Sequence, residues 1–203
     1  MKWQEDLTKD IRLSKDKLNN REIMYEHPYN TGEQQIEFTE DNKLALLEYF
    51  LQVKDTCKAI LEIGVCRNSQ DSSTYIFLNN KNDSTIYMGI DLDDKSFLNN
   101  TEKNIHTIKS SSFDIEKNIE SFKAAGIEQF DFIFIDGWHS INAVLIDWEY
   151  TKLLSPNGIV GFHDTSCHSG PHDFIRALNT EKWHVVPNLC PNDWGIGFAW
   201  LKS

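Results

Sequence analysis

Two pairs of residues, each placed just after a run of apolar side chains, could perform acid–base or metal chemistry. In DFIFIDGWHS (131–140), Asp136 follows four apolar residues and His139 comes three positions later. The pair His163-Asp164 follows the second run, GIVGF (158–162). A carboxylate is a hard oxygen ligand for a cation, and a neutral imidazole can accept a proton near pH 7. These four residues are the first candidates for a reactive centre.

Polar residues also follow two earlier apolar runs. LEIGV carries Glu62 and Gly64, and GIDLDD carries Asp91. An acid after the second strand of an α/β sheet commonly accepts hydrogen bonds from ribose hydroxyls, although a turn or helix-capping aspartate explains Asp91 equally well. Gly64 lets the backbone approach a ligand closely, but the turn lacks the further glycines of GxGxxG that hold a pyrophosphate. The pattern favours a nucleoside without phosphates.

The elements that must position these residues alternate in type. From about residue 58, short apolar runs alternate with longer amphipathic segments, which is typical of an α/β fold. In open α/β sheets ligands bind beyond the carboxyl ends of the strands, where the acids stand. The predicted strands are 59–65, 85–92, 105–109, 131–136, 158–164, 183–189 and 195–201, and the predicted helices lie near 69–80, 113–125, 141–154 and 171–180, with a turn or short helix at 95–104.

The strand patterns also predict how the sheet is ordered. Strands 59–65 and 131–136 are apolar on both faces, as neighbouring central parallel strands are. Only CPND (190–193) lies near the junction of the last two strands, too short for a helical crossover, so these should pair antiparallel. We therefore predict a Rossmann-like, doubly wound, mostly parallel seven-stranded sheet with one antiparallel strand.

A helix is predicted ahead of the first strand. The segment TEDNKLALLEYFLQV (39–53) begins with Thr39 as a helix N-cap, and Leu44, Leu47 and Phe50 would form its apolar stripe. Later along the chain, Leu145, Trp148 and Leu153 recur at helical spacing and are predicted to be core residues.

The whole chain, residues 1–203, is predicted to be one domain, because no repeat or linker divides it. A helical or lid segment would occupy residues 1–50 and a Rossmann-like core residues 58–203. Three residues of the first segment could cover the site as a lid: Tyr25, His27 and Tyr29.

Composition limits the classes of partner. The formal net charge of −11 repels phosphate backbones and anionic lipids, so we predict neither a nucleic-acid nor a membrane partner. No apolar run approaches the roughly 20 residues that cross a bilayer, and the first residues alternate charges, which predicts a cytoplasmic protein. Four widely spaced cysteines without a CxxC pair predict free thiols. A small-molecule substrate is expected, and a homo-oligomer is left open.

Four segments carry a resemblance to a known family. LEIGVCRNSQDSSTYIF, GIDLDD, FIFIDGWHSINAVLIDWEYTKLLSPNGIVGFHDT and GPHDFIRAL together resemble a class I S-adenosylmethionine-dependent methyltransferase. Within that class they are similar to the small-molecule O-methyltransferase branch of macrocin-type and cephalosporin hydroxylase-like proteins. The resemblance runs from about residue 31 to residue 180. Its specific part is DGxH followed by HDT at the ends of consecutive strands.

The resemblance implies S-adenosylmethionine as the cofactor. The first motif would lie near the methionine moiety, the acid after the second strand would hold the ribose, and the segment after the third strand would line the adenine. The chain departs from the family at Cys66-Arg67-Asn68, where many relatives carry Gly or Ser, which bears on cofactor affinity. The implied cofactor-binding residues are Glu62, Gly64, Asp91, Leu92, Ser111, Ser112, Asp136 and Trp138.

The resemblance also implies a divalent cation, usually Mg²⁺, and a general base. Asp136 and Asp164 would be metal ligands, and His139 would take a proton from a substrate hydroxyl that then attacks the sulfonium methyl group. Asp136 and His139 are thus the implied catalytic residues. Relatives carry Glu-Asp where this chain has His163-Asp164. His163 is a third ligand candidate, and since imidazole suits Zn²⁺, Fe²⁺, Mn²⁺ or Ni²⁺ better than Mg²⁺, the metal is left open.

Other interpretations remain at this point. The histidine-rich FHDTSCHSGPHD (162–173) suggests zinc, but its spacing fits no familiar zinc pattern and a loop capping the next helix is favoured. A nicotinamide-dependent oxidoreductase would need the missing glycine-rich turn. A non-catalytic binding protein could keep the same fold. The favoured function is O-methylation of a hydroxyl on a small molecule such as a sugar or another polyol-bearing metabolite.

Overall fold

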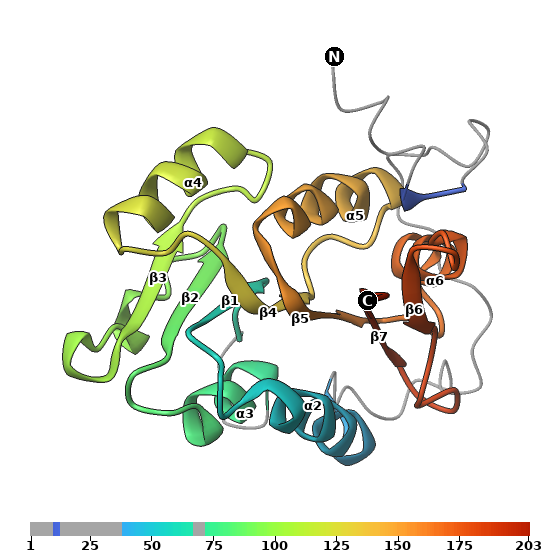
Figure 1. Cartoon of the computed structure of the whole chain (residues 1–203), viewed down its shortest axis with the longest axis horizontal. Helices are drawn as coiled ribbons and strands as arrows, with labels where there is room; N and C mark the ends of the chain where they lie inside the picture. Colours follow the sequence, from blue (N-terminus) through green and yellow to red (C-terminus); the bar gives the residue numbers. More distant parts are fainter. Residues whose placement is uncertain (1–9, 13–37, 67–71) are drawn as a thin grey trace.

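One mixed sheet runs through the molecule in the computed structural model, which describes residues 10–12, 38–66 and 72–203 (Figure 1). Its strand order is β3-β2-β1-β4-β5-β7-β6. The seven strands are β1 (Ala59–Ile63), β2 (Ile86–Asp91), β3 (Ile105–Lys109), β4 (Phe130–Ile135), β5 (Leu154–His163), β6 (Trp183–Val186) and β7 (Ile196–Leu201). The predicted fold class is confirmed.

The strand pairing follows the apolar patterns. β1 lies between β2 and β4 and is parallel to both, as predicted for two strands that are apolar on both faces. β7 is antiparallel to β5 on one side and to β6 on the other. β7 is therefore the predicted antiparallel strand, and its short connection from β6 is a hairpin. β5 begins at Leu154, earlier than predicted, with an irregularity in its pairing opposite Phe130 and Phe132.

Helices cover both faces of the sheet. On one face α2 and α3 pack on Phe132, Phe134 and their neighbours, and on the other α4, α5 and α6 lie over Ile133 and Ile135 (Figure 1). The helices are α2 (Glu40–Val53), α3 (Ser73–Asn80), α4 (Ile115–Ala124), α5 (Ile141–Asp147) and α6 (Ser169–Ala177), with 3₁₀ turns η2 (Ser96–Leu98), η3 (Thr101–Lys103) and η4 (Trp148–Leu153). The predicted helix 141–154 thus divides into α5 and η4.

The buried face of α2 differs from the predicted stripe. Thr39 is the N-cap, as predicted, and its hydroxyl also donates to Asp193 at 2.5 Å. Leu44 is 58% exposed, however, and the helix buries a face centred on Leu46 and Phe50. The segment is apolar around much of its circumference, so periodicity alone could not choose the face. The packing of α2 on the sheet determines which face of the helix is buried.

Several smaller predictions can be compared with the described residues. Leu145 and Trp148 are buried and Leu153 is partly buried against the same core, which confirms the core assignment. All four cysteines are free, as predicted, and all four are buried. No helix in the described ranges is both long enough and apolar enough to cross a membrane. The proposed lid residues Tyr25, His27 and Tyr29 lie outside the described residues.

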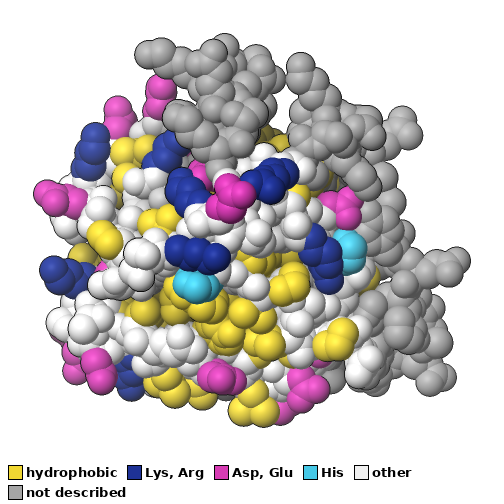
Figure 2. Space-filling model, turned by 45° about the vertical axis from the view of Figure 1, so that its right-hand side comes forward, with side chains coloured by type: hydrophobic (Ala, Val, Ile, Leu, Met, Phe, Trp, Pro, Cys, Tyr) yellow, Lys and Arg dark blue, Asp and Glu magenta, His cyan; other side chains and the backbone are white. Residues whose placement is uncertain are grey.

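On the face shown in Figure 2, Lys and Arg side chains stand among acidic ones and around a group of hydrophobic side chains. Proteins that track a phosphate backbone use a stripe or cluster of basic residues. The lack of a nucleic-acid partner remains a prediction.

Candidate active site

The carboxyl ends of four adjacent parallel strands form the candidate site. β2, β1, β4 and β5 are neighbours that run in the same direction, so the polar residues that follow them meet at one edge of the sheet. Backbone hydrogen bonds join these ends, since the Gly64 N–H donates to Ile90 O at 3.0 Å and the Asp136 N–H donates to Ile63 O at 2.8 Å. Predicted site residues from distant parts of the chain are thereby held together.

Gly64 allows the turn after β1 to pass against the end of β4. Its φ is +84°, a left-handed value that favours glycine. A Cβ atom at this position would lie 2.0 Å from the carbonyl oxygen of Asp136. The site therefore requires glycine here for two reasons, the backbone conformation and the close approach to Asp136.

Asp91 holds the turn after β1 from the end of β2. Its Oδ2 accepts the Val65 N–H at 2.9 Å, and its Oδ1 accepts the Asp93 N–H at 2.7 Å. Each carboxylate oxygen has a second lone pair, so Asp91 can still accept hydrogen bonds from a ligand. The ammonium group of Lys95 lies 3.8 Å from Asp91 Oδ2 and donates to Cys66 O at 2.8 Å. Sequence reasoning missed this buried lysine.

Glu62 lies beneath the turn and is completely buried. Its carboxylate accepts hydrogen bonds from Ser73 at 2.5 Å, from Thr74 at 2.7 Å and from the Tyr87 hydroxyl. Burial raises its pKa to about 7, against the opposing effect of these hydrogen bonds. The carboxylate thus ties β1 to α3 and β2, and a contact with a cofactor stays a prediction.

The predicted adenine-lining residues follow β3. The carbonyl of Ser111 accepts a hydrogen bond from the Asn118 side chain at 2.9 Å, and the carbonyl of Ser112 accepts one from the Tyr150 hydroxyl at 2.6 Å. These bonds fix the backbone of the loop. Leu92 is 71% exposed and Trp138 60% exposed, so both present apolar surface at the strand ends that a flat ring could cover.

A buried carboxyl group that sequence reasoning missed lies under this loop. Asp147, at the end of α5, is completely buried, and neither of its oxygens has a hydrogen-bond partner of good geometry among the described residues. Its Oδ2 would lie 3.0 Å from a Cβ at Gly137. Burial raises its pKa to about 7, and a nearby Ser112 opposes this only in part. The only sequence signal was a lone acid inside an apolar helix.

The DGxH and HDT motifs meet in one cluster. His163 Nδ1 lies 3.1 Å from Asp136 Oδ1 and 3.3 Å from Asp164 Oδ2, and His139 Nε2 lies 2.9 Å from Asp164 Oδ2. Asp164 has a φ of +61°, a strained value for a residue other than glycine. The four residues that the motifs singled out are therefore in direct contact.

Charge and burial in this cluster oppose each other. Burial disfavours the charged form of His163, but Asp164 and Asp136 raise its pKa well above the usual value. Burial likewise disfavours charge on Asp164, yet His163 and His139 hold its pKa well below the usual value. Asp136, His163 and Asp164 place their ligand atoms within 4.8 Å of one another. Two carboxylates and an imidazole in such a group fit a divalent cation.

The histidine-rich loop after β5 leads into a helix and contributes to the cluster. His168 is the N-cap residue of α6 but makes no capping hydrogen bond through its side chain, so only the position of the loop ahead of a helix agrees with the favoured interpretation. His168 is also buried, with Nε2 3.9 Å from Asp164 Oδ1 and its ring centroid 4.0 Å from that of His139. His172 instead pairs with Asp173 at 3.0 Å. Spacing could not reveal that His168 alone turns toward the motifs.

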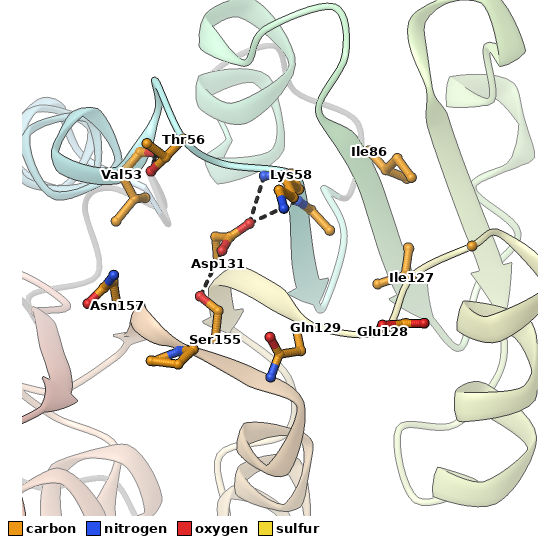
Figure 3. Close-up of a pocket in the computed structure, with 13 residues that line it drawn as sticks. Val53, Thr56, Lys58, Ile86, Ile127, Glu128, Gln129, Asp131, Ser155 and Asn157 are labelled. Carbon is orange, nitrogen blue, oxygen red and sulfur yellow. Dashed lines mark hydrogen bonds between the residues drawn. The ribbon is translucent and has the colours of Figure 1, made fainter.

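A cavity of about 460 Å³ lies at the opposite end of the sheet (Figure 3). It is lined by the amino ends of β1, β4 and β5, including Lys58, Asp131 and Ser155. Asp131 accepts the Lys58 N–H and the Ser155 hydroxyl, each at 2.7 Å. The two carboxylate oxygens of Asp131 therefore join the start of β4 to the starts of β1 and β5. Asp131, near the start of β4, is therefore structural, and only Asp136, which follows the end of β4, reaches the reactive cluster.

The sequence matches a family model described as a methyltransferase domain. The match covers residues 61–165, just over half of the 203 residues, and includes the turn after β1, DGxH and HDT. The chain belongs to this family. The predicted membership of the class I S-adenosylmethionine-dependent methyltransferases is confirmed, and with it the enzyme class. No curated protein matches the chain in sequence.

Solved structures share the methyltransferase fold. CalS11, described as a TDP-rhamnose 3'-O-methyltransferase of calicheamicin biosynthesis, has a TM-score of 0.59 at 11% identity, covering 82% of this chain and 83% of its own. The MycE methyltransferase of mycinamycin biosynthesis, described in complex with Mg and SAH, has a TM-score of 0.51 at 20% identity. That match covers 61% of this chain and 32% of MycE, so the chain spans about a third of the MycE length.

The fold is shared beyond small-molecule methyltransferases. A pre-rRNA processing fibrillarin from Methanococcus jannaschii has a TM-score of 0.53 at 13% identity, covering 71% of this chain and 66% of its own. The similarity to these three structures shows only the fold of this chain. The methyl acceptor must therefore be inferred from the residues of the site.

Proposed function

We propose that this methyltransferase transfers the methyl group of S-adenosylmethionine to a hydroxyl of a small molecule, such as a sugar or another polyol-bearing metabolite. One observation carries the proposal: His163 joins Asp136 to Asp164, and Asp164 contacts His139, at the same sheet edge where Asp91 holds the turn after β1. The described complexes of MycE with Mg and SAH and the described sugar methylation by CalS11 support it.

The cofactor would lie across the ends of β1, β2 and β4. Asp91 would accept the ribose hydroxyls, the backbone around Gly64 would lie against the methionine moiety, and the Ser111-Ser112 segment with Trp138 would border the adenine. The absence of a glycine-rich turn does not prevent this, because S-adenosylmethionine has no phosphates to cradle.

His139 would be the general base. Asp164, 2.9 Å from its Nε2, would stabilise the imidazolium that forms when His139 takes the proton of the acceptor hydroxyl. Asp136, His163 and Asp164 would hold a divalent cation, Mg²⁺ or another. Such a cation, when bound, lowers the pKa of a hydroxyl that it polarises.

Titration with S-adenosylhomocysteine tests the cofactor assignment. We expect calorimetry to give a micromolar Kd for the purified protein, and Asp91→Asn to weaken it by about 10- to 100-fold, since lost hydrogen bonds to a charged acceptor are worth roughly 1.5–3 kcal/mol. Asp83→Asn, in the exposed turn before β2, is the matched control. Absence of heat up to millimolar ligand would contradict the proposal.

Replacement of His139 separates chemistry from cofactor binding. With an acceptor found by screening hydroxylated sugars, His139→Ala should lower kcat by a factor on the order of 10² to 10⁴, the usual contribution of a general base. The Kd of this variant for S-adenosylhomocysteine should stay within about twofold of the wild-type value, because His139 is not among the residues proposed to bind the cofactor. An unchanged kcat would remove His139 from the base role.

A further inference from the structure

We propose that His139, Asp164 and His168 form a binding site for a nitrogen-preferring transition-metal ion such as Zn²⁺. This set differs from the Asp136, His163 and Asp164 group that the family resemblance implies, and shares only Asp164 with it. His168 has no counterpart among the residues that the resemblance singles out. The site concerns metal binding alone and does not depend on the proposed methyl acceptor.

The three side chains are close enough for one ion. Their ligand atoms all lie within 4.8 Å of one another, and His139 Nε2 and His168 Nε2 lie 2.9 Å and 3.9 Å from different oxygens of Asp164. Ligands about 2.1 Å from an ion lie roughly 3.0–3.4 Å apart at octahedral or tetrahedral angles. Small side-chain rotations therefore suffice to bring the three donors onto one ion.

The backbone holds the two histidines side by side. The Gly170 N–H, in the first turn of α6, donates to the carbonyl oxygen of His139 at 3.0 Å. A Cβ at Gly170 would lie 2.2 Å from that oxygen, so only glycine lets the helix approach this closely. α6 is thereby fixed against the loop after β4, and its N-cap residue His168 faces His139. Metal sites need such prior positioning of their ligands, because each freely rotating ligand adds an entropic cost.

The donor set selects the type of metal. Two imidazole nitrogens and one carboxylate suit Zn²⁺, Fe²⁺, Mn²⁺ or Ni²⁺, whereas Mg²⁺ prefers oxygen ligands and keeps several waters. Asp164 and His168 are buried and His139 is partly exposed, so an ion here would be held by protein on one side and open to solvent on the other. A metal at this site would also replace the contact between His139 Nε2 and Asp164 that the proposed function uses to stabilise the imidazolium, and so would compete with that role.

The test is calorimetric titration of the reduced, metal-free protein with Zn²⁺ in the absence of cofactor. We expect one ion per chain, with binding weakened at least ~10-fold in both His168→Gln and His139→Gln, since even outer-shell partners contribute this much. His172→Gln is the matched control, because His172 lies four residues further on and pairs with Asp173. Circular dichroism of each variant checks that it is folded, and His139→Gln serves if His168→Gln is not.

Absorption of bound Co²⁺ identifies the ligands without reference to activity. Nitrogen and oxygen ligands should give visible bands alone, and Cys167→Ser should leave the affinity unchanged, because the neighbouring thiol is not in the set. Near-ultraviolet thiolate bands, no uptake of Zn²⁺, or equal affinity in wild type and in the folded histidine variants would each overturn the site. Binding of S-adenosylhomocysteine is measured separately, so failure of one proposal leaves the other intact.

Discussion

Gly64→Ala should unfold the protein at markedly lower denaturant concentration than wild type. The new Cβ would meet the Asp136 carbonyl oxygen at 2.0 Å, and the residue would keep a φ of +84°. A left-handed conformation costs about 1–2 kcal/mol and a forced backbone shift about 1–3 kcal/mol, so we expect a loss of roughly 2–5 kcal/mol in the free energy of unfolding. Urea unfolding followed by circular dichroism measures it.

Gly126→Ala is the matched control for this substitution. Gly126 also has a left-handed φ, +77°, but a Cβ there would have no atom within 4 Å. The Gly126→Ala variant should therefore lose only the cost of the left-handed conformation, about 1–2 kcal/mol, from its free energy of unfolding. Equal losses in the two variants would show that the close approach between the turn after β1 and Asp136 contributes nothing. A larger loss at Gly64 together with weaker S-adenosylhomocysteine binding would connect this turn to the site.

Asp147→Asn should change how stability depends on pH. Burial raises the folded-state pKa of Asp147 from 3.8 to about 7, so the unfolded chain releases this proton at lower pH than the folded one. The wild type therefore loses stability as pH rises from about 4 to 7, whereas the neutral amide of the variant does not titrate. The stability of the variant relative to wild type should rise by about 2 to 3 kcal/mol between pH 5 and pH 8.

Thermal or urea unfolding at several pH values measures this difference. Glu62 also has a raised pKa, but it is present in both proteins and its effect cancels in the comparison. Any cost of the buried amide shifts the variant by the same amount at every pH, so the slope is the informative quantity. A difference independent of pH would mean that Asp147 is ionised in the folded protein and has a partner that holds its charge.

The sequence by itself determined the sheet and the chemical nature of its edge. β1 and β4 are apolar on both faces, and this pattern specifies neighbouring central strands whatever the details of packing. The polar residues that end each run, Asp91, Asp136 and Asp164, then had to meet, because parallel strands bring their carboxyl ends together. DGxH and HDT indicated a methyltransferase, and the family match confirmed that class.

Only the tertiary structure decided which side chains complete the site. Local periodicity records which residues are apolar but not which face the sheet will cover, so Leu44 is exposed where burial was predicted. Spacing in a loop does not fix where a side chain points, so His168 could not be separated from His172 until α6 packed against the carbonyl of His139. Asp147 is informative only because the folded core surrounds it. Contacts between elements far apart in the chain have no periodic signal in either element, and the fold alone creates them.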